Sequence, residues 1–170
     1  NGGYPGSLSI NSSTGLVTIN NASPAGTYTI TIRATNTNNP AGCSPDATPV
    51  DRTFVLRVNG PPTFTAEFGI TRTAGGSTTP MEPLNVKILD NLADDFTTLA
   101  NLVVTVNNGS SATVAGVTIS NLTRMNNMYF ADIVAACNAA TGQIPFTLRV
   151  TDEGGLTRAE LLTITVIPDP

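Results

Sequence analysis

Two cysteines, Cys43 and Cys137, are the side chains of this chain best suited to covalent chemistry. Each could form a disulfide, which requires that the two bridged Cα atoms lie within about 7 Å. Isolated thiols are uncommon in oxidising compartments, where paired cysteines cross-link small domains. The partner of each cysteine depends on where the surrounding elements place its loop.

Five acidic residues in two short segments form a second candidate site. Carboxylate oxygens are the ligands that Ca²⁺ prefers, so carboxylates gathered from two loops could hold this ion. The competing interpretation is a solvated loop rim, because neither a DxDxDG run nor an acidic linker accompanies them. Calcium is the one cofactor that the sequence suggests, and otherwise none is expected. The candidate ligands are Asp90, Asp94, Asp95, Asp152 and Glu153.

The absence of histidine excludes several classes of function. Without His, the chain cannot build a Ser-His-Asp or Cys-His catalytic site, or a zinc site that uses imidazole. The net charge of −4 and the lack of basic clusters argue against nucleic acid and anionic membranes as partners. No apolar run is long enough to span a bilayer. We therefore predict a protein that is not an enzyme and neither binds nucleic acid nor inserts into a membrane.

Alternating apolar and polar residues predict that the elements positioning these side chains are β-strands. One pattern occurs twice: residues 26–36 read GTYTITIRATN, and residues 144–153 read IPFTLRVTDE. Each segment is followed by a second alternating strand, over residues 52–59 and 159–167, and then by prolines. No segment has a helical period. The sequence therefore predicts an all-β chain made of two tandem β-sandwiches.

The two predicted domains differ in completeness. Residues 61–170 contain about seven strands, which fits an immunoglobulin-like sandwich. They include an opening strand over residues 63–70, a strand with Leu84, Val86 and Ile88 facing inward, and a strand over residues 114–119. Residues 1–60 contain only about four strands, so the first sandwich lacks its early strands. Either the chain is cut from a longer repeat array, or a neighbouring chain supplies those strands.

An incomplete sandwich exposes an apolar face and an unpaired sheet edge. A strand from another chain could fill this groove with alternate side chains and pair with the edge. The candidate groove residues are those predicted to face inward in the first domain: Leu8, Ile10, Val17, Ile19, Tyr28, Ile30, Ile32, Phe54, Leu56 and Val58.

Two stretches carry a family resemblance. Residues 4–19 read YPGSLSINSSTGLVTI and residues 25–35 read AGTYTITIRAT. Together they resemble the immunoglobulin-like and cadherin-like repeats of large bacterial surface proteins, and residues 99–106 and 150–156 look like the matching segments of a related repeat. The resemblance implies a non-enzymatic repeat located outside the cell or on its surface. Unlike the acidic calcium-binding linkers of true cadherins, residues 58–62 read VNGPP and contain no acid.

The predicted topology separates the two cysteines. Cys43 lies in the loop between the last two strands of the first domain, and Cys137 in the loop before the penultimate strand of the second. These two kinds of loop lie at opposite ends of a sandwich. We therefore expect a disulfide between successive units along a fibre. The alternative is that each thiol is free or has a separate partner.

Three functional hypotheses follow. In the first, the chain is a structural repeat unit of an extracellular bacterial filament, fibre or surface stalk. Its partners would be copies of itself or adjacent repeats of the same polypeptide, joined head-to-tail by strand complementation and inter-unit disulfides. In the second, it is an adhesin module that binds carbohydrate or protein with the assistance of calcium. In the third, it is an accessory domain of a secreted enzyme.

Overall fold

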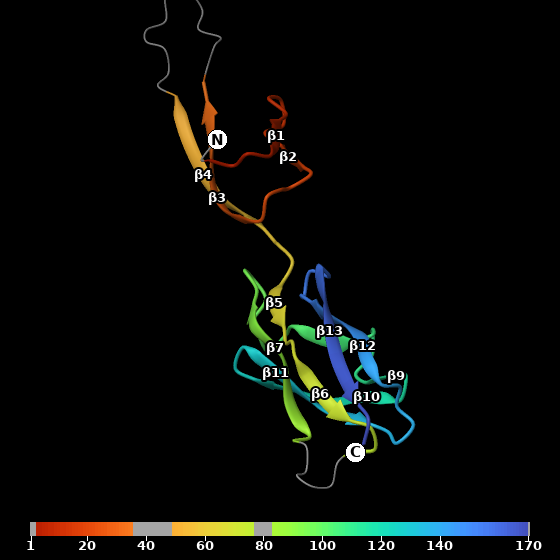
Figure 1. The fold of residues 1–170 in the computed structure, drawn as a ribbon. Coiled ribbons are helices and arrows are strands. Elements are labelled where there is room, and N and C mark those ends of the chain that lie inside the picture. Colours follow the sequence, from red (N-terminus) through yellow and green to blue (C-terminus); the bar gives the residue numbers. More distant parts are fainter. Residues whose placement is uncertain (1–2, 36–48, 77–82, 170) are drawn as a thin grey trace, which may run out of the picture. The chain divides into compact units, whose positions relative to one another are not determined.

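The computed structural model describes residues 3–35, 49–76 and 83–169. The chain folds as two compact units, Asn1–Gly60 and Pro61–Pro170, called unit 1 and unit 2 below. All regular secondary structure in the described residues consists of β-strands (Figure 1). None of these residues forms a helix with the length and apolar character needed to cross a membrane. The prediction of an all-β chain is confirmed.

The described part of unit 1 consists of two antiparallel strand pairs. β1 (Ser7–Ile10) pairs with β2 (Val17–Asn20), and β3 (Gly26–Ala34) pairs with β4 (Val50–Val58). The two pairs are separate sheets, each of two strands. Such small sheets are at most marginally stable alone, so each pair depends on packing against the other.

The turn between β1 and β2 is organised by one asparagine. The Asn11 Oδ1 atom accepts hydrogen bonds from the backbone N–H groups of Ser13 at 2.9 Å and Thr14 at 3.1 Å. Gly15 has a φ of 72° and donates its N–H to the Asn11 carbonyl at 2.8 Å. A short polar side chain followed by a residue with positive φ is a typical chain reversal. The chain therefore reverses direction between β1 and β2.

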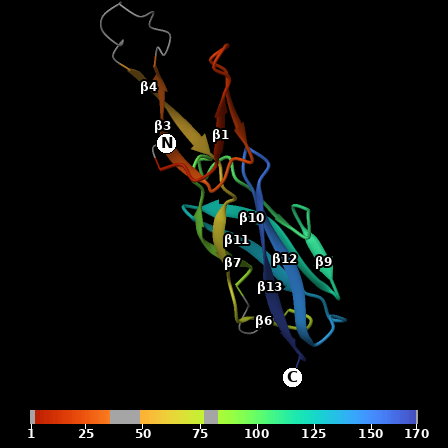
Figure 2. The ribbon, with the colours of Figure 1, turned by 90° about the horizontal axis from the view of Figure 1, so that it is seen from above.

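Unit 2 contains strands in two sheets that face each other (Figures 1 and 2). One sheet has the order β5-β7-β11-β10-β9, and the other β6-β13-β12-β8. All neighbours pair antiparallel except β6 and β13, which pair in parallel. The strands are β5 (Thr63–Ala66), β6 (Ile70–Thr73), β7 (Asn85–Ala93), β8 (Val103–Val106), β9 (Ala112–Val114), β10 (Val117–Met125), β11 (Met128–Ala135), β12 (Gly142–Thr151) and β13 (Thr157–Ile167).

The strand order of unit 2 defines its fold. The sheet order β5-β7-β11-β10 corresponds to A-B-E-D of an immunoglobulin-like sandwich, and β8-β12-β13 corresponds to C-F-G. β6 adds a strand beside the last strand of the second sheet, and β9 adds one at the far edge of the first. The prediction of an immunoglobulin-like β-sandwich is therefore confirmed for this part of the chain.

Alternate side chains of both sheets meet in the core of unit 2. This arrangement follows from the period of two along a strand, which places every second side chain on the same face. Each apolar side chain that is fully buried contributes about 1.5–3 kcal/mol relative to exposure. The buried residues on β12 and β13 are Ile144, Phe146, Leu148, Val150, Leu162, Ile164 and Val166, as the alternation predicted.

Strand β7 departs from the predicted alternation. Leu84 precedes the strand and is 57% exposed, whereas Ile88 and its neighbour Leu89 are both fully buried. The register on β11 shifts between Lys87 and Leu89, so Ile88 is an extra residue in β7. Such a β-bulge turns the strand and places two consecutive side chains on one face. The bulge explains why Leu89 is buried beside Ile88, whereas the predicted inward position of Leu84 was wrong because Leu84 lies before the first paired residue of β7.

Two predicted strands are each divided into two shorter strands by a turn. The stretch 63–70 leaves one sheet at Ala66 and enters the other at Ile70, after Gly69 with a φ of 74°. The stretch 114–119 reverses direction at Ala115 and Gly116, which have φ values of 47° and 84°. A single alternating segment predicted from the sequence thus becomes two paired strands in each case.

Arg72 joins the two sheets of unit 2 along one side. It extends from β6 with only 5% of its surface exposed. Its Nε donates to the Ile133 carbonyl of β11 at 2.9 Å, and its Nη2 donates to the Pro83 carbonyl just before β7, also at 2.9 Å. Hydrogen bonds from a charged donor are stronger than neutral ones, so this guanidinium ties β6 to the opposite sheet.

Glu160 makes a second connection between the sheets. One carboxylate oxygen accepts the backbone N–H of Ala66 in β5 at 2.9 Å, and the other accepts from the Arg158 guanidinium. Burial raises the pKa of Glu160, but the hydrogen bonds from Ala66 and Arg158 and the charge of Arg158 lower it by more. The net pKa lies below the usual value of 4.5.

We expect Arg72→Ala to destabilise unit 2 by about 2–4 kcal/mol, because it removes charge-assisted bonds and leaves carbonyl groups unpaired. The measurement is urea-induced unfolding followed by circular dichroism. Arg124→Ala, which removes an exposed arginine bonded to the Asn126 carbonyl, is the control and should cost less than about 0.5 kcal/mol. Equal losses in the two variants would contradict the assigned role.

We also expect Glu160 to make the stability of unit 2 depend on pH in the acid range. Because its folded pKa is lowered, its contribution is present above the unfolded pKa and is lost as the pH falls through the folded value, below about 4.5. The free energy of unfolding should be compared for wild type and Glu160→Gln between pH 7 and pH 3. The gap between them should narrow below about pH 4.5, and a constant gap would be inconsistent with this linkage.

Candidate functional site

The predicted groove of unit 1 lies between the two strand pairs. One part of the groove is filled by a small core of three buried residues, Tyr4, Ile30 and Val58. Partly buried side chains from all four strands pack against this core. They are Leu8, Ile19, Tyr28, Phe54 and Leu56, all predicted as inward-facing groove residues.

Tyr4 is the core residue that was missing from the predicted groove. Its ring packs edge-on against Tyr28, with centroids 4.9 Å apart and an interplanar angle of 64°. Gly6 lies against the Tyr4 ring so closely that a side chain at position 6 would overlap it. The Tyr28 hydroxyl donates to the Pro24 carbonyl at 3.1 Å. The signal was present in the sequence, since Tyr4 stands two residues before a glycine at the start of the first hairpin.

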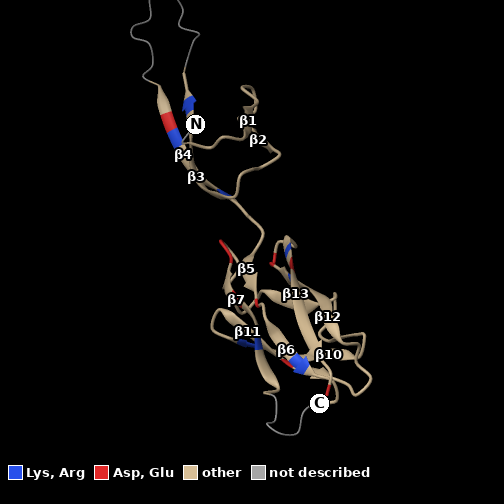
Figure 3. Ribbon diagram, viewed as in Figure 1, with Lys and Arg blue, Asp and Glu red and all other residues tan. Residues whose placement is uncertain are grey.

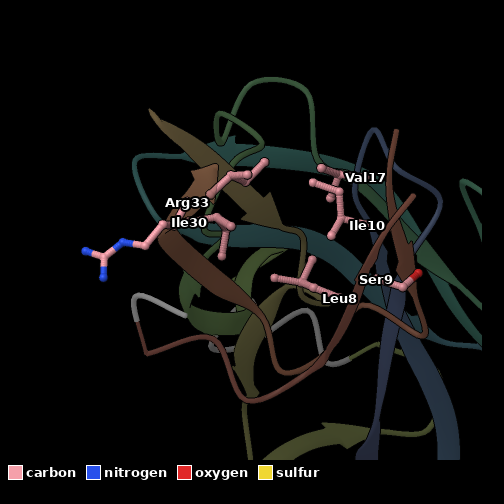
Figure 4. A pocket seen from close by; sticks show the side chains of 7 residues that line it. Leu8, Ser9, Ile10, Val17, Ile30 and Arg33 are labelled. Atoms are coloured by element: carbon pink, nitrogen blue, oxygen red, sulfur yellow. The ribbon is translucent and has the colours of Figure 1, made fainter. Parts of the chain in front are cut away.

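The other part of the groove is open. A hollow of about 210 Å³ is lined by Leu8, Ile10 and Val17 of the first strand pair and by Ile30 and Ile32 of β3. Figure 4 shows the side chains of Leu8, Ile10, Val17 and Ile30 around this hollow. Ile10 is 51% exposed, although its side chain faces the hollow. Five of the predicted groove residues thus line an apolar depression that is not filled by the described part of unit 1.

A second hollow of about 430 Å³ shares Ile10 and Ile32 with the first. It extends from the turn after β1 to the end of β3, where it is lined by Ala34 and Thr35. None of the residues lining either hollow comes from β4. The open part of the groove therefore runs along β3.

Arg33 lies at the border of both hollows but turns its charge away from them. Figure 4 shows its guanidinium pointing away from the cluster of apolar side chains. Its Nε and Nη2 atoms donate to the two carboxylate oxygens of Asp51 at 2.8 Å and 2.9 Å. This pairing lowers the pKa of Asp51 and raises the pKa of Arg33, chiefly through the hydrogen bonds between the side chains. The cation is thus held outside the groove.

Within the described residues of unit 1, the charged side chains are confined to one strand pair. Figure 3 shows charged positions on β3 and β4 and none on β1 or β2. Among the side chains that line the smaller hollow, only that of Arg33 is charged. A ligand for this surface therefore needs apolar side chains more than charge.

Cys137 lies in the loop between β11 and β12, and its side chain is exposed and free of any disulfide. The loop is fixed by hydrogen bonds from the Ala136 N–H to the Gly116 carbonyl at 2.9 Å and from the Ala140 N–H to the Ala115 carbonyl at 3.0 Å. The Gly75 N–H donates to the Ala135 carbonyl at 3.1 Å. Cys43 lies outside the described residues, so the predicted inter-unit disulfide stays a prediction.

The position of Cys137 within unit 2 can be read from the strand registers. Ala74, next to Gly75, donates its N–H to the Ile167 carbonyl at the end of β13. The Cys137 loop is therefore at the end of unit 2 where β13 finishes. The strand β5, which follows the linker, starts opposite Ala93 at the other end of the sandwich.

The predicted calcium ligands mostly serve as local acceptors. Asp94 Oδ1 accepts from the Phe96 and Thr97 N–H groups, Asp152 Oδ1 accepts from the Leu156 N–H, and Glu153 Oε1 accepts from the Asn101 amide. Asp90 accepts from Lys87 Nζ at 3.0 Å, and this bond lowers the pKa of Asp90.

Two of the acidic loops nevertheless lie side by side. The Glu153 N–H donates a hydrogen bond to the Thr97 hydroxyl at 3.2 Å. The backbone N–H of Thr97 in turn donates to Asp94 Oδ1. Within the ranges that the structure describes, no three Asp, Glu, Cys or His side chains are grouped closely enough to hold a metal ion. Calcium binding by these residues, including exposed Asp95, stays a prediction.

Comparisons with known proteins add little to this geometry. No family model matches the chain, and no curated protein matches it. One solved structure that matches is titled "Protocadherin gammaB7 EC3-6 cis-dimer structure". The alignment has 14% sequence identity and a TM-score of 0.42, and it covers 94% of this chain and 36% of that one. The chain thus spans little more than a third of the length of its match.

Proposed function

We propose that this chain is a structural repeat unit of an extracellular bacterial filament, fibre or surface stalk, assembled head-to-tail by strand complementation. The observation that carries this proposal is the open apolar groove between the two strand pairs of unit 1. Exposed apolar grooves beside unpaired strand edges are sites of association between chains. The resemblance of residues 4–19 and 25–35 to bacterial surface repeats supports the cellular location.

Unit 2 supports this proposal because it also contains two antiparallel strand pairs, and further strands of unit 2 itself pair with their edges. Its last four strands are also two antiparallel pairs, β10–β11 and β12–β13. Strand β7 covers β11, β8 covers β12, and β6 covers β13. In the described part of unit 1, no strand takes these positions. A neighbouring copy that supplied such strands would join one repeat to the next.

Joining copies in this way gives a mechanical role rather than a catalytic one. Main-chain hydrogen bonds along a complemented strand bind the neighbour, and alternate side chains fill the groove. A head-to-tail contact that does not close on itself produces an open filament. The exposed thiol of Cys137 lies at the end of unit 2 where its last strand finishes, which suits a covalent link to Cys43 of the next copy.

We expect the chain to form a series of oligomers whose size increases with protein concentration, measured by sedimentation velocity. Ile32→Asp places a carboxylate in the open groove and should shift the chain to monomer, because burying an unpaired charge is costly. Thr31→Asp is the matched control, since Thr31 is the exposed neighbour on the opposite face of β3. This variant should assemble like the wild type.

Circular dichroism of both variants must match the wild type, so that loss of assembly is not loss of folding. A wild-type chain that remains monomeric at all concentrations would overturn the proposed function. Equal weakening by Ile32→Asp and Thr31→Asp would show that assembly does not use the groove.

The expected disulfide gives a second prediction. Assembled wild-type chains, denatured without reductant, should migrate as multiples of one chain in electrophoresis and collapse to a single chain with reductant. Cys137→Ser should migrate as one chain in both conditions. A wild-type chain that migrates as a monomer in both conditions, but faster without reductant than with it, would instead reveal a Cys43–Cys137 bond within one chain.

A further inference from the structure

The outer face of one sheet of unit 2 carries a positive charge without a partner. Arg149 lies on β12, between β8 and β13, and points outward because Leu148 and Val150 point into the core. Its Nε atom is buried and has no hydrogen-bond partner in the described part of the chain, and no described carboxylate forms an ion pair with it. The other cations of unit 2 bond carbonyl or carboxylate oxygens; they are Arg72, Lys87, Arg124 and Arg158.

Apolar side chains flank Arg149 on both sides. Leu161 of β13 lies opposite Thr147, and Val103 of β8 lies opposite Thr151. These two threonines precede and follow Arg149 by two residues on β12. Leu161 is 63% exposed and Val103 is 58% exposed. The Arg149 row, defined as Leu161, Arg149 and Val103, therefore runs diagonally across three strands, with successive positions about 7–8 Å apart.

The outer face of the other sheet carries a similar row with the opposite charge. On β11, Ala131 and Ile133 are buried, so Phe130, Asp132 and Val134 point outward. Val134 is 45% exposed. Side chains on the same face of one strand are about 7 Å apart. The Asp132 row, defined as Phe130, Asp132 and Val134, thus has nearly the same spacing as the Arg149 row.

Asp132 also has no cation beside it. The Asn121 Nδ2 atom donates to Asp132 Oδ2 at 2.6 Å and holds the carboxylate in place. Lys87, on the neighbouring strand β7, pairs instead with Glu67 and Asp90, each at 3.0 Å. Within the described residues, Asp132 is therefore a carboxylate that forms no ion pair, just as Arg149 is a guanidinium that forms none.

We infer that unit 2 of one copy packs its Asp132 row against the Arg149 row of a second copy. Within one copy the two rows lie on opposite outer faces of the sandwich, so Asp132 and Arg149 cannot meet there. Between two copies they form a charge-assisted pair, and the exposed apolar side chains on either side cover one another. The inference goes beyond the proposed filament because it needs unit 2 alone.

The directions of the two rows fit face-to-face packing of sheets. The Asp132 row follows its strand. The Arg149 row crosses its strands at about 35°, since neighbouring strands are about 4.8 Å apart and alternate residues about 7 Å apart. Superposing the rows makes the strands of the two copies cross at this angle, close to the roughly 30° of aligned sheets. Because the two faces differ, further copies stack side by side without closing.

The test uses the full chain carrying Ile32→Asp, because this change weakens the groove contact of unit 1. A single flat contact is small and therefore weak, so this chain should be monomeric in sedimentation velocity and associate only at concentrations on the order of 1 mM. Sedimentation equilibrium up to that concentration is the measurement. Raising the salt from about 0.05 M to about 0.5 M should weaken the association, because salt screens exposed charges.

Exchanging the two charges locates the contact. Arg149→Glu and Asp132→Arg should each weaken association at least about tenfold, because each places like charges opposite one another. An equimolar mixture of the two variants should associate as the Ile32→Asp chain does, because the new carboxylate of one variant then faces the new guanidinium of the other. Arg124→Glu is the matched control: it makes the same change of net charge outside both rows and should alter the affinity less than about twofold.

Recovery in the mixture would also show that both variants are folded. An Ile32→Asp chain that stays monomeric up to about 1 mM overturns the inference, as does a mixture that associates no better than its components. Equal weakening by Arg124→Glu also overturns it, because net charge would then govern association. None of these results affects the proposed filament, which uses the groove of unit 1. Association that follows the exchanged charges, in a chain whose wild type never assembles through the groove, would support this contact while the filament proposal fails.

Discussion

The need of a β-sheet to bury its apolar face is the constraint on which the rest of this structure depends. A strand pair has one apolar face and two edges, and it is stable only when another layer covers that face. Unit 2 meets this requirement with strands of its own, which form two complete layers around Phe146 and Leu148. The described part of unit 1 meets it only around Tyr4, Ile30 and Val58.

The contrast between the units gives the proposed function its physical basis. Apolar contact is not directional, so the open hollow beside Ile10 and Ile32 attracts any apolar surface. The edge of β3 that no described strand pairs with adds direction, because main-chain hydrogen bonds require an extended partner in register. Together these features favour a strand over a compact ligand. The Arg33–Asp51 pair keeps its charges on the other face and leaves the groove apolar.

Unit 2 also shows how polar side chains hold the two sheets of a sandwich together along one side. The chain moves from one sheet to the other between Ala66 and Ile70, and at this crossing the sheets are tied by polar groups. Arg72 donates to carbonyls of the opposite sheet, and Glu160 accepts from a backbone N–H there. These side chains interrupt otherwise apolar alternation, and each forms a hydrogen bond with a backbone group of the opposite sheet.

The sequence by itself determined the all-β fold, the inward faces of β3, β12 and β13, and most of the groove residues, because alternation with a period of two directly records which side chains share a face. It did not determine the bulge that buries both Ile88 and Leu89, since an extra residue is visible only against the paired strand. Nor did it show that Tyr4 fills one part of the groove and leaves the part beside Ile32 open. The packing of one strand pair against the other decides which apolar residues are covered, and only the tertiary structure contains that information.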